Sequence, residues 1–367
     1  MDHTPFPHHV RGLLDDPLHV ARSAARQGAR IIGYWGEDVP VALIIAAGAL
    51  PLRLRGVAGG ATPRADEFLE SAFAPELRAV VEQWLTGALD FIDCVVLPRG
   101  DDSAQRLYYY LDELRRRGAC GGPRPLLYDV ANIARPTSAE YTRESTRRLA
   151  SELRGADSAL ADSALSNAAR RVAERDALLT QIRARRASAA PLPGSLAWRL
   201  ERVAACDWRV EFDAAARAFL ERAPALSAPR RVMLAGDPLP DDTLHLAIER
   251  VGGSVVLELN EPVTEDLTAR PTLDAIADHF QSRLNPVLAM RANPRWSVEL
   301  AHSVRADAVV FWLLEENESL PWEISRQIHA LESADLPKLL LTRQPWPPPE
   351  SVRRQVTDFM TTHPETR

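Results

Sequence analysis

Cysteine is scarce in this chain, which has three, Cys94, Cys120 and Cys206, among 367 residues. They lie far apart and form no Cys-x-x-Cys pair, so neither a zinc ribbon nor a disulfide framework is indicated. Cys94 belongs to an apolar segment and is expected to be a small buried side chain. An excess of basic charge is also missing, because the formal net charge is −6. A general nucleic-acid-binding protein is normally basic, so we expect no nucleic-acid partner.

A continuous apolar run that could cross a membrane is missing as well. The most apolar stretch, residues 39–52, is shorter than the about 20 residues that a spanning helix needs, and charged residues flank it. It predicts a short buried helix over residues 42–49 and then a half-exposed strand. The opening MDHTPFPHHVRGLL has neither the apolar core nor the cleavage site of a secretory signal. We therefore expect a cytoplasmic protein that has no membrane contact.

Strand and helix patterns alternate in two separate parts of the chain. The first part has apolar strands at ARIIGYW, DFIDCVVLP and PRPLLYDVAN, with amphipathic helices between them. The second part has strands at RRVMLAG, SVVLELN, DAVVFWLL and LPKLLLTRQPW, again separated by helices. Such alternation is typical of parallel sheets built from βαβ units. We therefore predict an α/β fold with two lobes of open, mainly parallel sheets.

The middle of the chain has a different pattern. Residues 137–186 predict amphipathic helices without a sustained heptad, and ASAAPLPGS is typical of a linker. We therefore predict an N-terminal α/β lobe over residues 1–136, a helical segment and linker over 137–230, and a C-terminal α/β lobe over 231–367. Two α/β lobes usually bind their ligand in the cleft between them.

Six segments occur in an order that resembles one known family. They are GYWGEDVPVALIIAAGALPLRLRG, ADEFLESAFAPELRAVVEQWL, DCVVLPRGDDSAQRLYYYLDEL, RRVMLAGDPLP, GGSVVLELN and LPKLLLTRQPW. The chain is similar from about residue 10 to residue 346 to the 2-hydroxyacyl-CoA dehydratase and benzoyl-CoA reductase family. The resemblance implies a D-component type subunit, built of two lobes around a four-iron, four-sulfur cluster, that works in pairs on acyl-CoA substrates.

In that family three cysteines hold the cluster, and the resemblance places Ala74, Asp101 and Asn317 at their positions. None of these residues has a thiol, and the three cysteines of the chain fall elsewhere. Iron–sulfur clusters are held by cysteine thiolates. We therefore expect that the cluster has been lost, that the chain binds no cofactor, and that it has no metal site.

Other side chains are expected at the cleft together with these three positions. They are Trp35, Glu37, Asp102, Ser103, Asp237 and Glu316. One interpretation is that Asp101, Asp102 and the glutamates 315, 316 and 318 hold a hard cation; the other is that the aspartates cap a helix and the glutamates are solvated. The LAGDPLP segment is compatible with an anion site at a helix start or with a plain turn at Asp237.

A lost cluster would leave space that larger side chains must fill. Trp35 and Trp312 are expected to reach into it, and nearby arginines are candidates for the anionic groups of a CoA: Arg53, Arg55, Arg99 and Arg106. The histidines of the N-terminal tail, His3, His8 and His9, are expected to be exposed.

Three hypotheses for function remain open at this point. The chain is a cluster-free subunit of an acyl-CoA-processing complex, whose redox chemistry is supplied by a partner. Alternatively it is a stand-alone acyl-CoA lyase-type enzyme that uses acid–base chemistry, or a binding or scaffold protein that has lost catalysis. Because family subunits work in pairs, we expect a heterodimer with a paralogous subunit or a homodimer.

Overall fold

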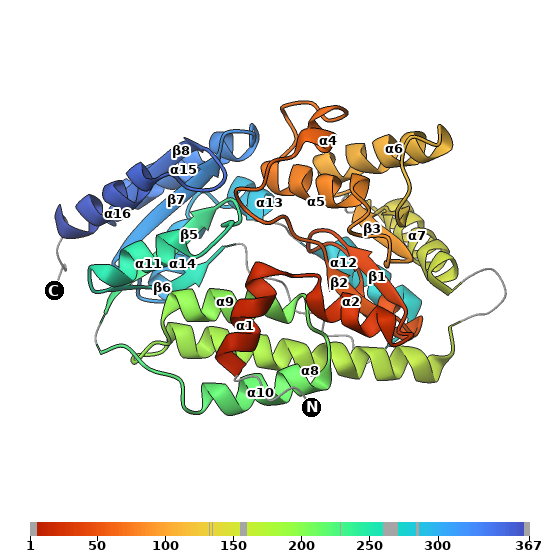
Figure 1. The fold of residues 1–367 in the computed structure, drawn as a ribbon. Coiled ribbons are helices and arrows are strands. Elements are labelled where there is room, and N and C mark those ends of the chain that lie inside the picture. The colour runs from red at the N-terminus through yellow and green to blue at the C-terminus, as the bar shows by residue number, and fades with distance from the viewer. Residues whose placement is uncertain are drawn as a thin grey trace.

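The computed structural model describes residues 6–131, 133, 135–154, 160–227, 229–259, 271–283 and 286–362. Two four-stranded parallel sheets form two lobes (Figure 1). The first has the order β2-β1-β3-β4, with β1 (Ile31–Tyr34), β2 (Leu50–Arg53), β3 (Cys94–Pro98) and β4 (Arg124–Tyr128). The second has the order β6-β5-β7-β8, with β5 (Arg230–Gly236), β6 (Gly253–Glu258), β7 (Ala308–Leu314) and β8 (Lys338–Gln344). The predicted two-lobed α/β class is confirmed.

Helices cover both faces of each sheet. Those next to the first sheet in the sequence are α2 (His19–Arg26), α3 (Val41–Ala46), α4 (Pro63–Asp66), α5 (Pro75–Leu85) and α6 (Asp102–Arg116). Those of the second lobe are α11 (Thr243–Arg250), α13 (Pro286–Ala292), α14 (Trp296–Ser303), α15 (Leu320–Ser333) and α16 (Glu350–Thr362). In β1, Ile32 faces the core that contains α3, while Ile31 faces the core that contains α5. Burial on both faces explains why the strands are almost continuously apolar.

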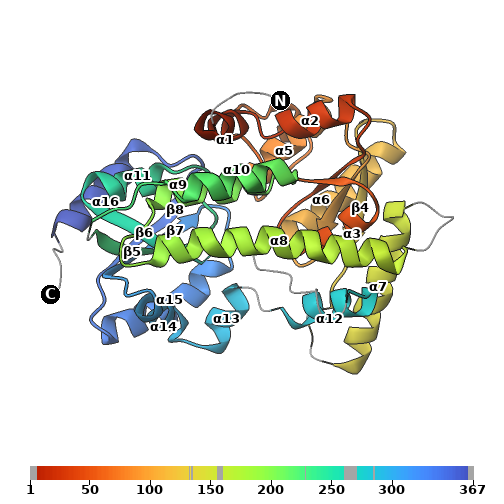
Figure 2. The ribbon, with the colours of Figure 1, turned by 90° about the horizontal axis from the view of Figure 1, so that it is seen from below.

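A helical segment joins the lobes, as predicted. It consists of α7 (Pro136–Arg154), α8 (Asp162–Ala187), α9 (Gly194–Ala204) and α10 (Val210–Leu220). Figure 2 shows the 26-residue α8 running along both lobes. Its first half packs on the first lobe through Leu165 and Val172, and Arg186 near its end pairs with Glu258 of β6 at 3.3 Å. The single helix α8 therefore supports both sheets.

One helix from the second half of the chain packs against the first lobe. In α12 (Leu273–Ser282), Ile276 and Phe280 belong to the core of the first sheet. The Phe280 ring meets Tyr128 at the end of β4 edge-on, with centroids 5.8 Å apart. At the surface, Arg147 of α7 pairs with Asp274 at 2.7 Å. The chain thus returns from the second sheet to the first.

Residues 6–15 form the helix α1 (Phe6–Asp15) and not a tail; His8 is exposed as expected, whereas His9 is half-buried. Its Val10 and Leu13 are buried against α9 and α10. His9 lies 3.1 Å from the carboxylate of Asp207, and His3 lies outside the described residues. The apolar spacing of Phe6, Val10 and Leu13 is the helical signal that predicts this packing.

Candidate functional site

The predicted cleft residues lie at the carboxyl ends of the two sheets, where ligands bind in open α/β folds. The loops after β1 and β3 carry Trp35, Glu37 and Asp101, and the loops after β5 and β7 carry Asp237, Glu316 and Asn317. Within the described residues no hydrogen bond joins the first group to the second.

In the first group, Trp35 and Asp101 bind each other. The indole N–H of Trp35 donates to Asp101 Oδ2 at 2.9 Å, and Asp101 Oδ1 accepts from the backbone N–H of Ala104 at 3.1 Å. Asp101 is thus the N-cap of α6, which is the capping interpretation of the sequence. Asp102 is exposed in the first turn of α6, and Ser103 beside it is half-buried.

The remaining first-lobe candidates do not share a contact with this pair. Glu37 forms an ion pair with Arg53 of β2, and its carbonyl accepts from Arg283 at 2.6 Å. Glu37 and Arg53 line a small cavity of about 60 Å³ together with Trp208. Ala74 is the residue before α5 and is half-buried; its methyl group offers no ligand atom.

In the second group, the carboxylate of Asp237 joins two loops. Its Oδ2 accepts from the backbone N–H of Leu314 at 2.7 Å, and its Oδ1 accepts from the amide of Asn317 at 2.6 Å. The Asp237 N–H donates to the carbonyl of Trp312 at 2.8 Å, across a turn in which Gly236 has φ +110°. This N–H is engaged within the protein, so the structure supports the plain-turn interpretation of LAGDPLP. Burial raises the pKa of Asp237.

Asn317 and Glu316 complete the second group. Asn317 Oδ1 accepts from the N–H groups of Ser319 and Leu320 at 3.2 and 3.0 Å, at the start of α15. Glu316 has a buried Oε2 without a hydrogen-bond partner in the described part of the chain. Burial is the main cause that raises its pKa, Glu315 adds to the effect, and Arg78 of α5 opposes it. Glu316 thus lies within electrostatic reach of the first lobe.

Several expected positions were wrong. Trp312 does not reach into the cleft: it is 1% exposed and belongs to the core between the second sheet and helices α11 and α16. Arg99 pairs with Asp129 at 2.7 Å, and Arg106 pairs with Glu70 at the surface. The acidic residues proposed for a cation do not converge, because no three histidine, cysteine or acidic side chains of the described residues form a metal-binding group.

The residues that the resemblance places at the three cysteine positions of the family do not fit an iron–sulfur cluster. Asp101 and Asn317 use their side-chain oxygens as helix and turn caps, and Ala74 has no donor atom. The cysteines lie on other elements: Cys94 at the start of β3, Cys120 after α6 and Cys206 after α9. Burial raises the pKa of Cys94 to about 11 and also raises the pKa of Cys206, so neither favours a thiolate.

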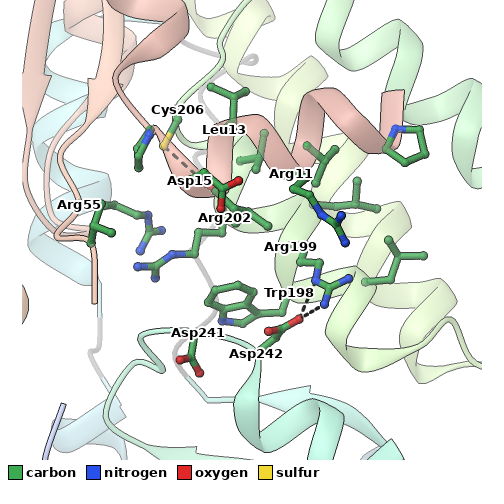
Figure 3. A pocket seen from close by; sticks show the side chains of 18 of the residues that line it. Arg11, Leu13, Asp15, Arg55, Trp198, Arg199, Arg202, Cys206, Asp241 and Asp242 are labelled. Carbon is green, nitrogen blue, oxygen red and sulfur yellow. Dashed lines mark hydrogen bonds and ion pairs between the residues drawn. The ribbon is translucent and has the colours of Figure 1, made fainter. Parts of the chain in front are cut away.

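A cavity of about 610 Å³ lies between the lobes (Figure 3), and its position was not expected from the sequence, although Arg55 in its wall was a candidate for binding anionic groups. Its walls come from α1, the loop after β2, α9 and the loop after β5. Its polar side chains include Arg55, Arg199, Arg202 and Asp242. Arg199 and Arg202 lie in LAWRLERVA, where they and Glu201 interrupt an apolar helix; that pattern is a signal that could have indicated them.

Replacing Asp237 with alanine is expected to lower the free energy of unfolding by about 2–4 kcal/mol, because two donors lose their acceptor. Urea unfolding followed by circular dichroism measures the loss. Asp102→Ala is the control, because Asp102 is exposed in the first turn of α6, and it is expected to change stability by less than about 0.5 kcal/mol. Equal effects of the two substitutions would contradict the assigned role of Asp237.

The fold and these loops define a class of protein with two parallel α/β lobes and a site between their carboxyl ends. A family model described as 2-hydroxyglutaryl-CoA dehydratase, D-component, matches residues 38–361. The chain belongs to this family, and the resemblance found in the sequence is confirmed. No curated protein matches the chain. Among the described residues, no helix is both long and apolar enough to cross a membrane.

Proposed function

We propose that this chain is a cluster-free subunit of an acyl-CoA-processing complex, in which a partner subunit carries the cluster and its redox chemistry. One observation carries the proposal. At the positions where the resemblance expects three thiolates, the chain has Ala74, Asp101 and Asn317, and the two polar residues are engaged in capping hydrogen bonds. Side chains used in this way stabilise loops and are not available as ligands.

The partner proposed is a paralogous subunit that has the cysteines, with a second copy of this chain as the alternative. The family description names a component, which supports a multi-subunit enzyme. In such a complex this chain would contribute a surface for the partner and groups for an acyl-CoA. We place the complex in the cytoplasm.

A second candidate is a stand-alone lyase-type enzyme that uses acid–base chemistry, and Glu316 favours it. A carboxyl group with a raised pKa and an unpartnered buried oxygen is the kind of group that accepts or donates a proton. In this case Glu316 would hold the proton at Oε2, close to the loop of Asp237. A third reading, a non-catalytic scaffold, requires neither the partner nor the proton transfer.

The protein purified without oxygen is expected to be colourless and to contain far less than four irons per chain. Iron and acid-labile sulfide analysis is the measurement. Asp101→Cys is the matched variant, because it restores one thiol at a former ligand position. The Asp101→Cys variant should still contain far less than four irons per chain, since Ala74 and Asn317 offer no thiolate. About four irons per wild-type chain would contradict the cluster-free proposal.

A turnover assay together with titration calorimetry, both with short acyl-CoAs, separates the three hypotheses. Turnover by the single chain that is lost in Glu316→Gln supports the lyase. Turnover only after a cysteine-complete partner is added supports the complex. Absence of acyl-CoA binding at millimolar concentration, with the partner as well as without it, leaves the scaffold.

A further inference from the structure

The cavity between α1, α9 and the loops after β2 and β5 concentrates arginine side chains. Figure 3 shows Arg55 and Arg202 directed toward each other inside it, with Trp198 beside Arg202 and Arg199 directed toward Asp242. Its volume of about 610 Å³ lies within the range of small-molecule sites. Two positive charges that face each other in a cavity favour an anionic ligand.

Local packing brings Arg55 into the cavity. In LPLRLRG the leucines Leu52 and Leu54 are buried, so Arg53 and Arg55 point to the opposite face. The next residue, Gly56, packs directly against the first turn of α5, where an added Cβ would lie 2.6 Å from the carbonyl of Glu76. A side chain at this position would clash with α5, so glycine allows the segment after β2 to pack closely there, with Arg55 at the cavity wall.

Among the described residues, Arg55 has no counter-ion of its own. Its Nε is buried and has no hydrogen-bond partner within the described residues. Burial lowers the pKa of Arg55 to about 9, and repulsion from Arg53 and Arg202 adds to the effect. Glu76 acts in the opposite direction, but it already accepts from Arg202 at 3.2 Å.

Two of the nearby acids are occupied as well, while a third, Asp15, lines the cavity without an ion-pair partner among the described residues. Asp242 accepts from Arg199 at 2.6 Å, and Asp241 accepts from the backbone N–H of Thr243 at 2.8 Å at the start of α11. Asp15 lies at the exposed end of α1. An anion placed between Arg55 and Arg202 would therefore meet two guanidinium groups that otherwise repel each other.

Much of the remaining wall is apolar, although His8, Arg11 and Asp15 also line it. Leu13 of α1 and Val203 of α9 are buried there, and Trp198 lies beside Arg202, whose guanidinium carbon is 5.0 Å from the ring centroid. A ligand that fits both the arginine pair and the apolar wall has a phosphate at one end and an apolar or aromatic body at the other. Guanidinium groups match the oxygens of a phosphate with two parallel hydrogen bonds.

We propose that this cavity binds a phosphate ester: Arg55 and Arg202 hold the phosphate, and the apolar wall of α1 and α9 contacts the organic part. A free nucleotide and the nucleotide end of a CoA share this chemistry. The proposal does not depend on the loss of the cluster, because none of its residues is at a former cysteine position.

Thermal unfolding and titration calorimetry of the full-length protein test the site, with adenosine 3′,5′-bisphosphate, CoA and uncharged adenosine as probes. We expect the two phosphate esters to raise Tm and adenosine to leave it unchanged. CoA binding at least tenfold tighter than the bisphosphate identifies the CoA as the source, and equal binding identifies a free nucleotide. Both outcomes support the proposal. No binding of either ester at millimolar concentration, or adenosine binding as tightly as the esters, overturns it.

The variant Arg55→Gln separates binding from stability. Because it removes a buried charge that two arginines repel, it should keep or raise Tm without ligand, yet weaken ester binding at least tenfold. Arg106→Gln is the matched control, since Arg106 pairs with Glu70 at the surface outside the cavity and its loss should not affect binding. If Arg55→Gln does not fold, Arg55→Lys takes its place, because an ammonium group cannot form the paired hydrogen bonds. Ester binding as tight as in the wild type, in whichever variant folds, overturns the proposal.

Discussion

Gly236→Ala is expected to destabilise the protein by about 4 kcal/mol or more, or to prevent soluble expression. An added Cβ at Gly236 would lie well under 3.0 Å from the carbonyl oxygen of Trp312, a backbone atom of the neighbouring strand β7. The φ of +110° adds strain for any side chain. Relief of the clash would separate β5 from β7 at the point where Asp237 holds both loops. Soluble yield and urea unfolding are the measurements.

Substitutions at two other glycines separate the two causes of the expected loss of stability, which are the Cβ clash and the backbone strain. Gly252 has φ +80° but open space around its Cβ position, so Gly252→Ala should cost about 1–2 kcal/mol from backbone strain alone. Gly121 has neither a positive φ nor a near neighbour, and Gly121→Ala should change stability little. A loss in Gly236→Ala no larger than that in Gly252→Ala would show that the strands adjust without difficulty.

Asp213→Ala is expected to lower the free energy of unfolding by about 3–5 kcal/mol, because it leaves a buried arginine without its counter-ion. Arg175 of α8 is 1% exposed and donates to Asp213 of α10 at 2.8 Å, while Arg171 donates to the other carboxylate oxygen at 2.7 Å. Arg175 also donates to the carbonyl of Asp207 and stacks over Trp208. Thermal and urea unfolding measure the loss.

An exposed ion pair provides the comparison. Glu113 pairs with Arg116 and Arg117 on the surface of α6, and Glu113→Ala should have no measurable effect because solvent screens these charges. The double variant Arg175→Met with Asp213→Leu should recover most of the stability lost in Asp213→Ala, since it removes both buried charges. If Asp213→Ala and Glu113→Ala behave alike, the buried pair does not have the assigned role.

The strands and their parallel order were predictable because runs buried on both faces are apolar and end in turn residues. The same property explains the error at Trp312. In AVVFWLL every side chain is apolar, so the pattern shows that β7 is buried but not which face each residue takes. The capping role of Asp101 was predictable because it depends on residues that are near each other in sequence.

Sequence patterns indicate single arginines, such as Arg55, but not that they share one cavity. Arg55 follows β2, Arg202 lies on α9, and Asp242 comes after β5, so only the packing of three distant segments brings them together. The partner of Asp237 was likewise unpredictable, because its hydrogen bonds join two loops about 80 residues apart in a register that β5 and β7 set.

The return of α12 to the first lobe has an evolutionary consequence. Phe280 and Ile276 complete the core beneath Tyr128, although they are encoded beyond the strands β5 and β6. Recombination between related genes at a single point between the lobes would pair α12 of one parent with the first sheet of another. A functional hybrid therefore needs either two crossover points or parents that match at both sides of this contact, so the two lobes are inherited together rather than exchanged as modules.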